Sequence, residues 1–196
     1  MTGRHVTAVV LAGGRSSRFG RDKLAEPLDG RPLLHHAIDA VRPFATEIVV
    51  VAAPDGSPVL PAGVLVTHDA AAFEGPLAGL ITGLASASGS VVLVIGGDMP
   101  SLVGAVIESM LVGLDAPGVD AVVLEHDGRA RPLPLVVRRD PALAVAGELH
   151  AAGERRLRAI THALSTRVIP ETIWRTLDPA GVTLLDIDTP TDLPGA

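Results

Sequence analysis

Short runs of apolar and β-branched residues recur along this chain. Each run is continuous rather than alternating, which is typical of strands buried on both faces of a parallel sheet. Stretches with apolar residues at helical spacing lie between them, at 33–41, 80–87 and 106–114. The expected strands are residues 6–11, 48–51, 64–67, 91–95, 121–124 and 182–187. This alternation predicts an α/β fold: a single-domain, Rossmann-like, mostly parallel sheet with helices on both faces.

The pattern changes beyond residue 128. Residues 129–137 are predicted to form an added strand, and Pro132 and Pro134 favour an edge position because proline cannot donate to a sheet ladder. Residues 140–150 and 154–164 have helical spacing, whereas 171–180 are polar and irregular. We expect one domain over residues 1–196.

Composition excludes several function classes. The 196 residues include no cysteine, which excludes disulfides, thiol nucleophiles and cysteine-ligated metal centres. A net charge of −6 and the scarcity of aromatic residues argue against nucleic acid as a partner. No apolar run approaches about 18 residues, so we expect no membrane span and no membrane partner. The apolar run at 6–11 is too short for a signal peptide, and we expect a cytoplasmic protein.

A glycine-rich, basic loop follows the first expected strand. It reads L-A-G-G-R-S-S-R-F-G-R-D-K from Leu11 to Lys23, which fits neither the dinucleotide fingerprint nor the ATPase P-loop. Gly13 and Gly14 still let backbone N–H groups approach an anion. Four cations follow within a short span: Arg15, Arg18, Arg21 and Lys23. Because arginine and lysine both bind phosphate oxygens, this loop is predicted to bind nucleotide phosphates.

Asp98 follows the expected strand at 91–95, in the run G-G-D-M-P. Ligands of doubly wound sheets bind in the crevice beyond the carboxyl ends of the strands. Magnesium prefers a carboxylate or two together with substrate phosphates and water. Asp98 is therefore a candidate Mg²⁺ ligand, with capping of the following helix as the alternative.

Three further runs stand at the ends of expected elements. The run G-P-L-A-G at 75–79 comes shortly after Asp69 and suits a helix start, since proline is favoured at the first helical position. Asp186 and Asp188 alternate on an expected strand and so share a face. The run G-E-R-R at 153–156 puts two arginines near a helix N-terminus, where anions bind. Each run also has a purely structural alternative. The run at 75–79 could simply begin a helix, Asp188 could cap one, and the arginines at 155–156 could lie on a solvated charged face.

Together these motifs resemble the MobA-like NTP transferases, nearest to the branch of molybdenum cofactor guanylyltransferases. The loop matches L-A-G-G-x-S-x-R-F-G-x-x-K, and the later motifs agree in order and spacing over nearly the whole chain. The resemblance implies Mg²⁺-dependent transfer of GMP from GTP to the molybdenum–molybdopterin cofactor, with release of pyrophosphate. It also implies a nucleotide-binding half (1–125), an acceptor-binding half (126–196) and transient contacts with other molybdenum cofactor biosynthesis proteins.

The same resemblance assigns roles residue by residue. Nucleotide binding falls to Leu11, Ala12, Gly13, Gly14, Lys23, Asp69, Gly75 and Asp98. The catalytic residues would be Arg18, Lys23 and Asp98, with Asp98 as the metal ligand. The acceptor would contact Arg155, Arg156 and Asp188. Two departures stand out: some relatives have Asn at the positions of Asp186 and Asp188, and the Asn that some have after the second strand is missing here.

Two alternatives remain open. One is the same chemistry with CTP or another nucleotide, acting on molybdopterin or on a small phosphorylated acceptor. The other is a catalytically silent nucleotide-binding module, which need not keep both the cations and the carboxylates. A nicotinamide dehydrogenase fails on the loop spacing, and the histidines lack the spacing of a metal motif.

Overall fold

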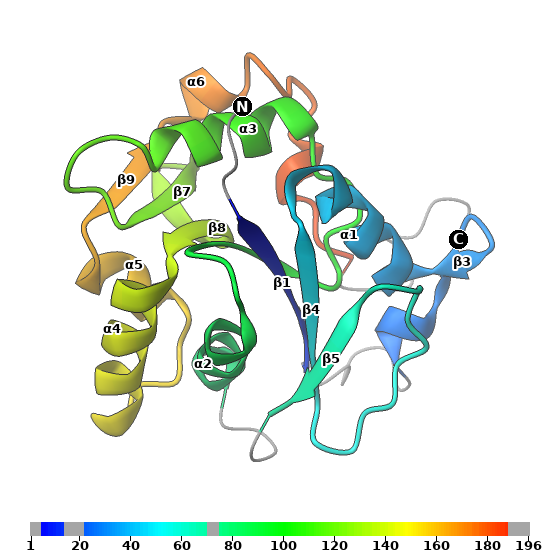
Figure 1. The fold of residues 1–196 in the computed structure, drawn as a ribbon. Helices are drawn as coiled ribbons and strands as arrows, with labels where there is room; N and C mark the ends of the chain where they lie inside the picture. Colours follow the sequence, from blue (N-terminus) through cyan, green and yellow to red (C-terminus); the bar gives the residue numbers. More distant parts are fainter. Residues whose placement is uncertain (1–4, 14–21, 70–74, 188–196) are drawn as a thin grey trace.

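A seven-stranded sheet runs through the molecule (Figure 1). The computed structural model describes residues 5–13, 22–69 and 75–187. The strand order is β5-β4-β1-β6-β8-β7-β9, and within these residues β8 alone runs antiparallel to its neighbours. The strands are β1 (Val6–Ala12), β4 (Glu47–Ala52), β5 (Leu65–His68), β6 (Val91–Gly96), β7 (Ala121–His126), β8 (Arg129–Arg138) and β9 (Thr166–Ile169). A separate small hairpin joins β2 (Pro27–Leu28) to β3 (Arg31–Pro32).

Helices cover both faces of the sheet. One face packs against α1 (Leu33–Val41), α3 (Gly104–Gly113) and α6 (Glu171–Trp174). The other packs against α2 (Pro76–Ser86), α4 (Arg139–Ala151) and α5 (Arg158–Ala163). Short 3₁₀ turns are η1 (Lys23–Ala25), η2 (Arg42–Phe44) and η3 (Val182–Leu184). Across the described ranges, no helix combines the length and apolar character that a bilayer crossing would require.

The predicted fold class is confirmed, and five predicted strands appear as β1, β4, β5, β6 and β7. The core strands are buried because valine, leucine and isoleucine from both sides of each strand reach a helical layer. One expectation of burial is wrong: Leu65 and Val66 on β5 are 54% and 48% exposed. β5 ends the sheet, so its apolar residues have a neighbouring strand on one side only.

The prediction of an edge strand at 129–137 is wrong, because β8 lies between β6 and β7. The pairing with β7 jumps from Val123 opposite Leu135 to Leu124 opposite Arg131. Pro132 and Pro134 fall inside this irregularity, where no ladder hydrogen bond is required of them. A bulge therefore admits two prolines to a central strand.

The prediction of a strand at 182–187 is also wrong. Residues 182–184 form η3, because the buried carboxylate of Asp178 accepts hydrogen bonds from the backbone N–H groups of Gly181, Val182 and Thr183. The helix expected at 154–164 is shorter and begins at Arg158. The irregular segment at 171–180 contains α6, and β9 before it was not predicted.

Candidate functional site

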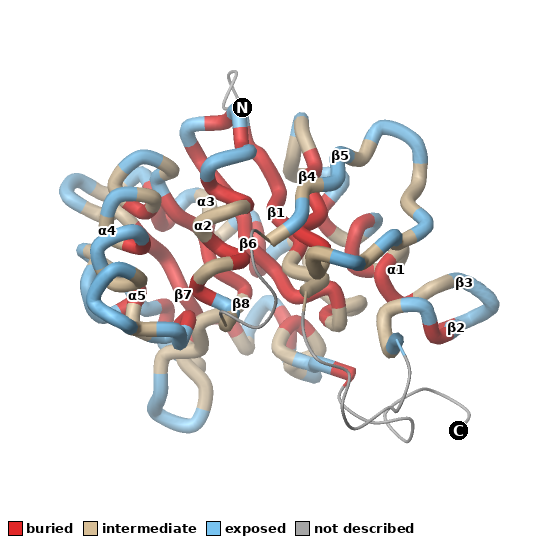
Figure 2. The backbone as a smooth tube through the Cα atoms, turned by 90° about the horizontal axis from the view of Figure 1, so that it is seen from below, coloured by how far each residue is buried: buried red, intermediate tan, exposed pale blue. Residues whose placement is uncertain are grey.

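The carboxyl ends of β1, β4 and β6 meet at one edge of the sheet, and the candidate residues gather there. Leu11 and Ala12 end β1, Gly13 follows them, and Asp98 follows β6. The N–H of Gly97 donates to the carbonyl oxygen of Leu11 at 3.0 Å, so the loop after β6 is tied to β1. Figure 2 shows these three strands buried along most of their length. The sheet is thus a rigid base for the loops at its end.

Lys23 and Asp98 form an ion pair at this edge. Lys23 Nζ lies 2.7 Å from Asp98 Oδ2, and the two side chains are 17% and 25% exposed. Lys23 Nζ also donates to the carbonyl oxygen of Ile187 at 3.1 Å, and the N–H of Ile187 donates to the carbonyl oxygen of Asp98 at 3.0 Å. Three segments far apart in sequence therefore meet at Lys23 and Asp98, and solvent can still reach the Asp98 carboxylate.

The local fold holds Lys23 in place. Asp22 caps η1, its Oδ1 accepting from the N–H of Leu24 at 3.0 Å. Lys23 is the first residue of that turn, so the capped backbone fixes the position from which its side chain extends. The predicted catalytic lysine and the predicted metal ligand are therefore brought together by the fold.

Asp69 lies between the end of β1 and α2. A Cβ atom on Gly13 would come 3.3 Å from Asp69 Oδ2, and one on Gly79 would come 3.5 Å from it. The N–H of Asp69 donates to the carbonyl oxygen of Ala52 at 3.1 Å, which ties this residue to β4. The Asp69 carboxylate therefore packs against both glycines, with the tighter approach at Gly13.

Gly75 brings two of the sequence motifs into contact. Its φ is +89°, a conformation that favours glycine, and a Cβ there would lie 2.8 Å from the carbonyl oxygen of Arg155. The N–H of Leu77, in the first turn of α2, donates to the same oxygen at 3.2 Å. The runs at 75–79 and 153–156 are therefore neighbours at this edge of the molecule.

The side chains of Arg155 and Arg156 are both engaged within the protein. Arg155 Nη1 donates to the carbonyl oxygens of His150 and Glu154, both at 2.9 Å. Glu154 Oε1 accepts from the N–H groups of Arg156 and Arg155 and from Arg156 Nε, and these bonds lower the pKa of Glu154 to about 2. Arg156 nevertheless stays 66% exposed. It can offer its remaining N–H groups to a ligand.

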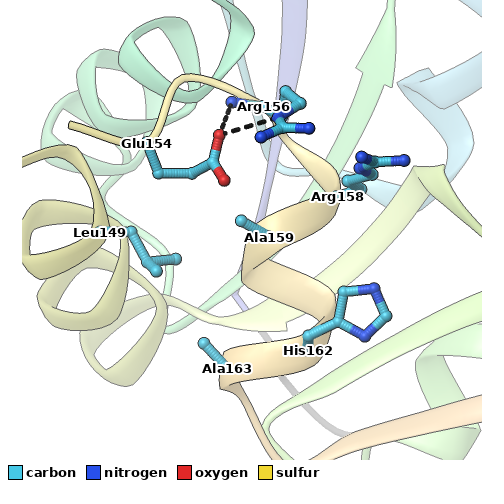
Figure 3. A pocket seen from close by; sticks show the side chains of 7 residues that line it. All are labelled: Leu149, Glu154, Arg156, Arg158, Ala159, His162 and Ala163. Atoms are coloured by element: carbon cyan, nitrogen blue, oxygen red, sulfur yellow. Dashed lines mark hydrogen bonds and ion pairs between the residues drawn. The ribbon is translucent and has the colours of Figure 1, made fainter. Parts of the chain in front are cut away.

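A pocket of about 350 Å³ lies beside Arg156, between α4 and α5 (Figure 3). Its lining combines one acidic, several basic and some apolar side chains: Leu149, Glu154, Arg156, Arg158, Ala159, His162 and Ala163. It is a shallow feature of the α4–α5 surface. The sequence-predicted residues at the ends of β1 and β6 do not line it.

Three predicted site residues, Gly14, Arg18 and Asp188, lie outside the described residues. Asp188 directly follows Ile187, whose backbone bonds to Lys23 and Asp98. Their assigned roles therefore stay predictions.

Sequence reasoning missed one group of candidate metal ligands. His126, Asp127 and Glu171 offer ligand atoms that all lie within 4.8 Å of one another. His126 Nδ1 lies 3.0 Å from Glu171 Oε1 across 45 residues of sequence, a separation that no linear motif reveals. The N–H of Asp127, the ring of His126 and the guanidinium of Arg175 all bond to Glu171 and lower its pKa.

The donor chemistry fits Mg²⁺ better at Asp98 than at this group. Asp98 is a partly exposed carboxylate at the carboxyl end of a central strand, as a hard-oxygen site for a phosphate-bound Mg²⁺ requires. The other group includes an imidazole, and Arg175 Nε sits 3.2 Å from its Glu171. A nearby guanidinium opposes binding of a cation.

Known proteins resemble this chain in sequence. Residues 8–168 match the profile of the MobA-like NTP transferase domain. The chain is 35% identical to a protein of Chloroflexus aggregans named "probable molybdenum cofactor guanylyltransferase", covering 96% of this chain and 91% of that one. It is 33% identical to the molybdenum cofactor guanylyltransferase of Desulfosudis oleivorans, covering 96% and 92%.

Solved structures share the fold. The molybdopterin-guanine dinucleotide biosynthesis protein A of Archaeoglobus fulgidus superposes with a TM-score of 0.78 at 22% identity, over 95% of this chain and 94% of that one. The 2-C-methyl-D-erythritol 4-phosphate cytidylyltransferase of Thermus thermophilus superposes with a TM-score of 0.69 at 17% identity, over 94% of each. At these identities the likeness concerns the arrangement of strands and helices.

Proposed function

The chain belongs to the family of MobA-like NTP transferases and is a nucleotidyltransferase, and we propose that it transfers GMP from GTP to the molybdenum–molybdopterin cofactor. The products are the guanine dinucleotide form of the cofactor and pyrophosphate. The relatives named for this reaction, at 31–35% identity over most of their length, favour GTP over other nucleotides. We expect the enzyme to act in the cytoplasm, beside the proteins that supply molybdopterin.

The observation that carries the proposal is the Lys23–Asp98 pair. A lysine and a carboxylate meet at 2.7 Å beyond the carboxyl ends of the central strands, where ligands of such sheets bind. Lys23 is the last residue of the loop whose glycines and cations suit a triphosphate. A binding module without chemistry would need the cation but not the carboxylate.

The reaction requires little covalent help from the protein. A phosphate oxygen of the acceptor attacks the α-phosphorus of GTP, the new P–O bond forms, and the bond to the β-phosphate oxygen breaks. Because the attacking phosphate is already an anion near neutral pH, no general base is needed. Catalysis then rests on positioning and charge neutralisation. Lys23 would neutralise charge on the phosphates, and Arg18 would assist it.

Asp98 would hold the Mg²⁺ ion, which supplies charge neutralisation for the phosphate oxygens when bound. The carboxylate can serve both partners, since Oδ2 faces Lys23 and each oxygen has two lone pairs. Asp69, beside Gly13 and Gly79, would contact the nucleotide from the β4 side.

Nucleotide binding can be tested by thermal unfolding with GTP, CTP, ATP and UTP, each with and without Mg²⁺. A ligand that binds the native state raises its apparent stability by mass action, by about 2.7 kcal/mol at a hundred times Kd. We expect a rise with GTP that Mg²⁺ increases, and pyrophosphate release when molybdopterin is added.

A rise confined to CTP would reassign the chain to a cytidylyl transfer. GTP binding without pyrophosphate release from any phosphorylated acceptor would instead indicate a binding module and would overturn the proposed reaction.

A further inference from the structure

Gly96 is the last residue of β6, and its backbone conformation is one that other residues adopt as well. Its φ lies outside the positive range in which glycine is favoured, and it pairs in register with Leu11 of β1. Glycine within a strand weakens the strand, because the unfolded chain has more freedom to lose and no side chain packs. A glycine at such a place indicates that another group approaches the backbone closely.

The approaching group is the carboxylate of Asp98. A Cβ atom on Gly96 would overlap Asp98 Oδ1 and would come 3.4 Å from Met99 Cγ. The other carboxylate oxygen, Oδ2, lies 2.7 Å from Lys23 Nζ. One oxygen of Asp98 therefore occupies the space that a side chain at position 96 would fill, while the other oxygen pairs with Lys23.

The backbone around Gly96 is too constrained to make room for a methyl group. The N–H of Met99 donates to the carbonyl oxygen of Gly96 at 3.2 Å, and the N–H of Gly96 donates to Met99 Sδ at 3.4 Å. The next N–H, that of Gly97, donates to the carbonyl oxygen of Leu11 at 3.0 Å. Because β6 is buried along its whole length, the Asp98 side chain would move instead, by rotation about its Cα–Cβ bond. That rotation takes Oδ2 away from Lys23.

We propose that Gly96 is a positioning residue for the transfer reaction. Because it has no side chain, it lets the Asp98 carboxylate keep the one orientation that pairs with Lys23 and that would hold Mg²⁺. A site works best when its charged groups stand in the productive geometry before the ligand arrives. The inference rests on the proposed function for the role of Mg²⁺, whereas the steric control of the Asp98–Lys23 pair by Gly96 does not.

The first test measures how much Mn²⁺, used in place of Mg²⁺, strengthens GTP binding. Isothermal titration of the full chain with GTP, with and without Mn²⁺ and without any acceptor, gives this gain without turnover. We expect Gly96→Ala to reduce the gain by about 10- to 100-fold, the usual effect of losing a group that orients a metal ligand. The affinity for GTP without metal should be retained.

Gly97→Ala provides the matched control. It adds the same methyl group one residue further along, where a Cβ would come 3.1 Å from Leu24 Cδ1 and 3.2 Å from Leu34 Cδ1. These atoms are the ends of flexible side chains, and the Asp98 carboxylate is not among the atoms approached. Gly97→Ala should therefore keep the metal-dependent gain in GTP affinity.

The second test needs neither metal nor nucleotide. A double-mutant cycle of Lys23→Met and Asp98→Asn, followed by urea unfolding, measures the coupling between the two side chains. We expect coupling in the wild-type background and none in the Gly96→Ala background, because the rotated carboxylate no longer meets Lys23. A merely structural role for Gly96 would lower the stability of every variant and leave the coupling unchanged.

The outcomes separate this inference from the proposed function. If Mn²⁺ fails to strengthen GTP binding in the wild type, the metal assignment is wrong and the coupling alone decides the role of Gly96. Coupling that persists in the Gly96→Ala background, or that is absent from the wild type, would overturn the inference. So would an equal loss of the metal-dependent gain in Gly97→Ala, since the cause would then be a general disturbance of the loop.

Discussion

At the scale of single residues, two carboxylates organise the site in different ways. Asp98 is partly exposed and pairs with Lys23, so it stays available to a ligand. Asp178 is 3% exposed, and its carboxylate oxygens accept hydrogen bonds from backbone N–H groups. It therefore fixes the conformation of the backbone that leads to Ile187. Exposure and partner type together separate a chemical role from an architectural one.

Asp98→Asn should abolish most of the activity and leave the fold intact. The amide keeps the shape but loses the charge that Mg²⁺ and Lys23 require, and we expect kcat to fall by at least about 100-fold. Pyrophosphate release across a Mg²⁺ titration measures it. The exposed Asp39, paired with Arg31 at 2.6 Å, provides the control Asp39→Asn, which should retain wild-type turnover. Full Mg²⁺-dependent activity in Asp98→Asn would refute the metal assignment.

Asp178→Ala should destabilise the protein in a pH-dependent way. Burial acts to raise the pKa of Asp178, but hydrogen bonds from Thr183, Val182 and Gly181 outweigh it and hold the pKa below the ordinary 3.8. The stabilisation is therefore present above pH 3.8 and is lost as the pH falls through the folded-state pKa. We expect about 2–3 kcal/mol of lost unfolding free energy at pH 7.

Urea unfolding from pH 7 to pH 3 checks this. The gap between wild type and variant should narrow in acid, since protonation removes the same interaction. The exposed Asp55 gives the control Asp55→Ala, expected within about 0.5 kcal/mol of wild type at every pH. A gap that is constant with pH would contradict the role of the ionised carboxylate.

At the scale of elements, close packing of helix on sheet depends on where glycines stand. Gly83 faces β1 from the buried side of α2, and a Cβ there would overlap the Val9 side chain and come 3.2 Å from Val51 Cγ2. Gly147 on α4 is exposed, and a Cβ there would meet nothing within 4 Å. Glycine is therefore needed for close packing at position 83 of α2, whereas the structure shows no packing reason for glycine at position 147 of α4.

Alanine at these two positions should shift stability in opposite directions. Gly83→Ala should destabilise by about 1–3 kcal/mol through overpacking against β1. Gly147→Ala should stabilise by about 0.5–1 kcal/mol, because alanine loses less backbone entropy in a helix. Urea unfolding of both variants measures the pair. An unchanged or stabilised Gly83→Ala variant would show that α2 can move away from the sheet without cost, and a destabilised Gly147→Ala variant would contradict the entropy argument.

At the scale of the whole molecule, β8 joins the two halves of the chain. β7 precedes it in sequence, yet in the described sheet β7 pairs only with β8 and β9. The first half therefore completes its sheet with strands from the second. This interleaving favours one cooperative unit over two separable halves.

A fragment of residues 1–128 should accordingly fail to fold. It would leave β7 without a partner strand and expose the edge of β6, whose residues are fully or nearly fully buried in the intact chain. We expect no sigmoidal urea transition in circular dichroism, whereas the full chain should show one. A cooperative transition in the fragment would show that the first half is an independent domain.

The chain itself determined much of this protein. Continuous apolar runs predicted the central strands, because strands buried on both faces carry no polar alternation. The glycine-rich loop, Lys23 and Asp98 were recognisable because phosphate and metal chemistry demands particular residue types at strand ends, whereas Asp69 was assigned only through the family resemblance. These are local properties that can be recognised in the amino-acid sequence alone.

Contacts between distant segments of the chain set the remaining features. Pro132 and Pro134 predicted an edge strand, but the irregular pairing of β8 with β7 accommodates both prolines in the interior of the sheet. The apolar run at 182–187 suggested a strand, but Asp178 bends it into a turn that brings Ile187 to Lys23. The His126–Glu171 contact likewise depends on chain segments far apart in sequence. Such features depend on contacts between groups that are brought together only by folding, and no local sequence pattern predicts those contacts.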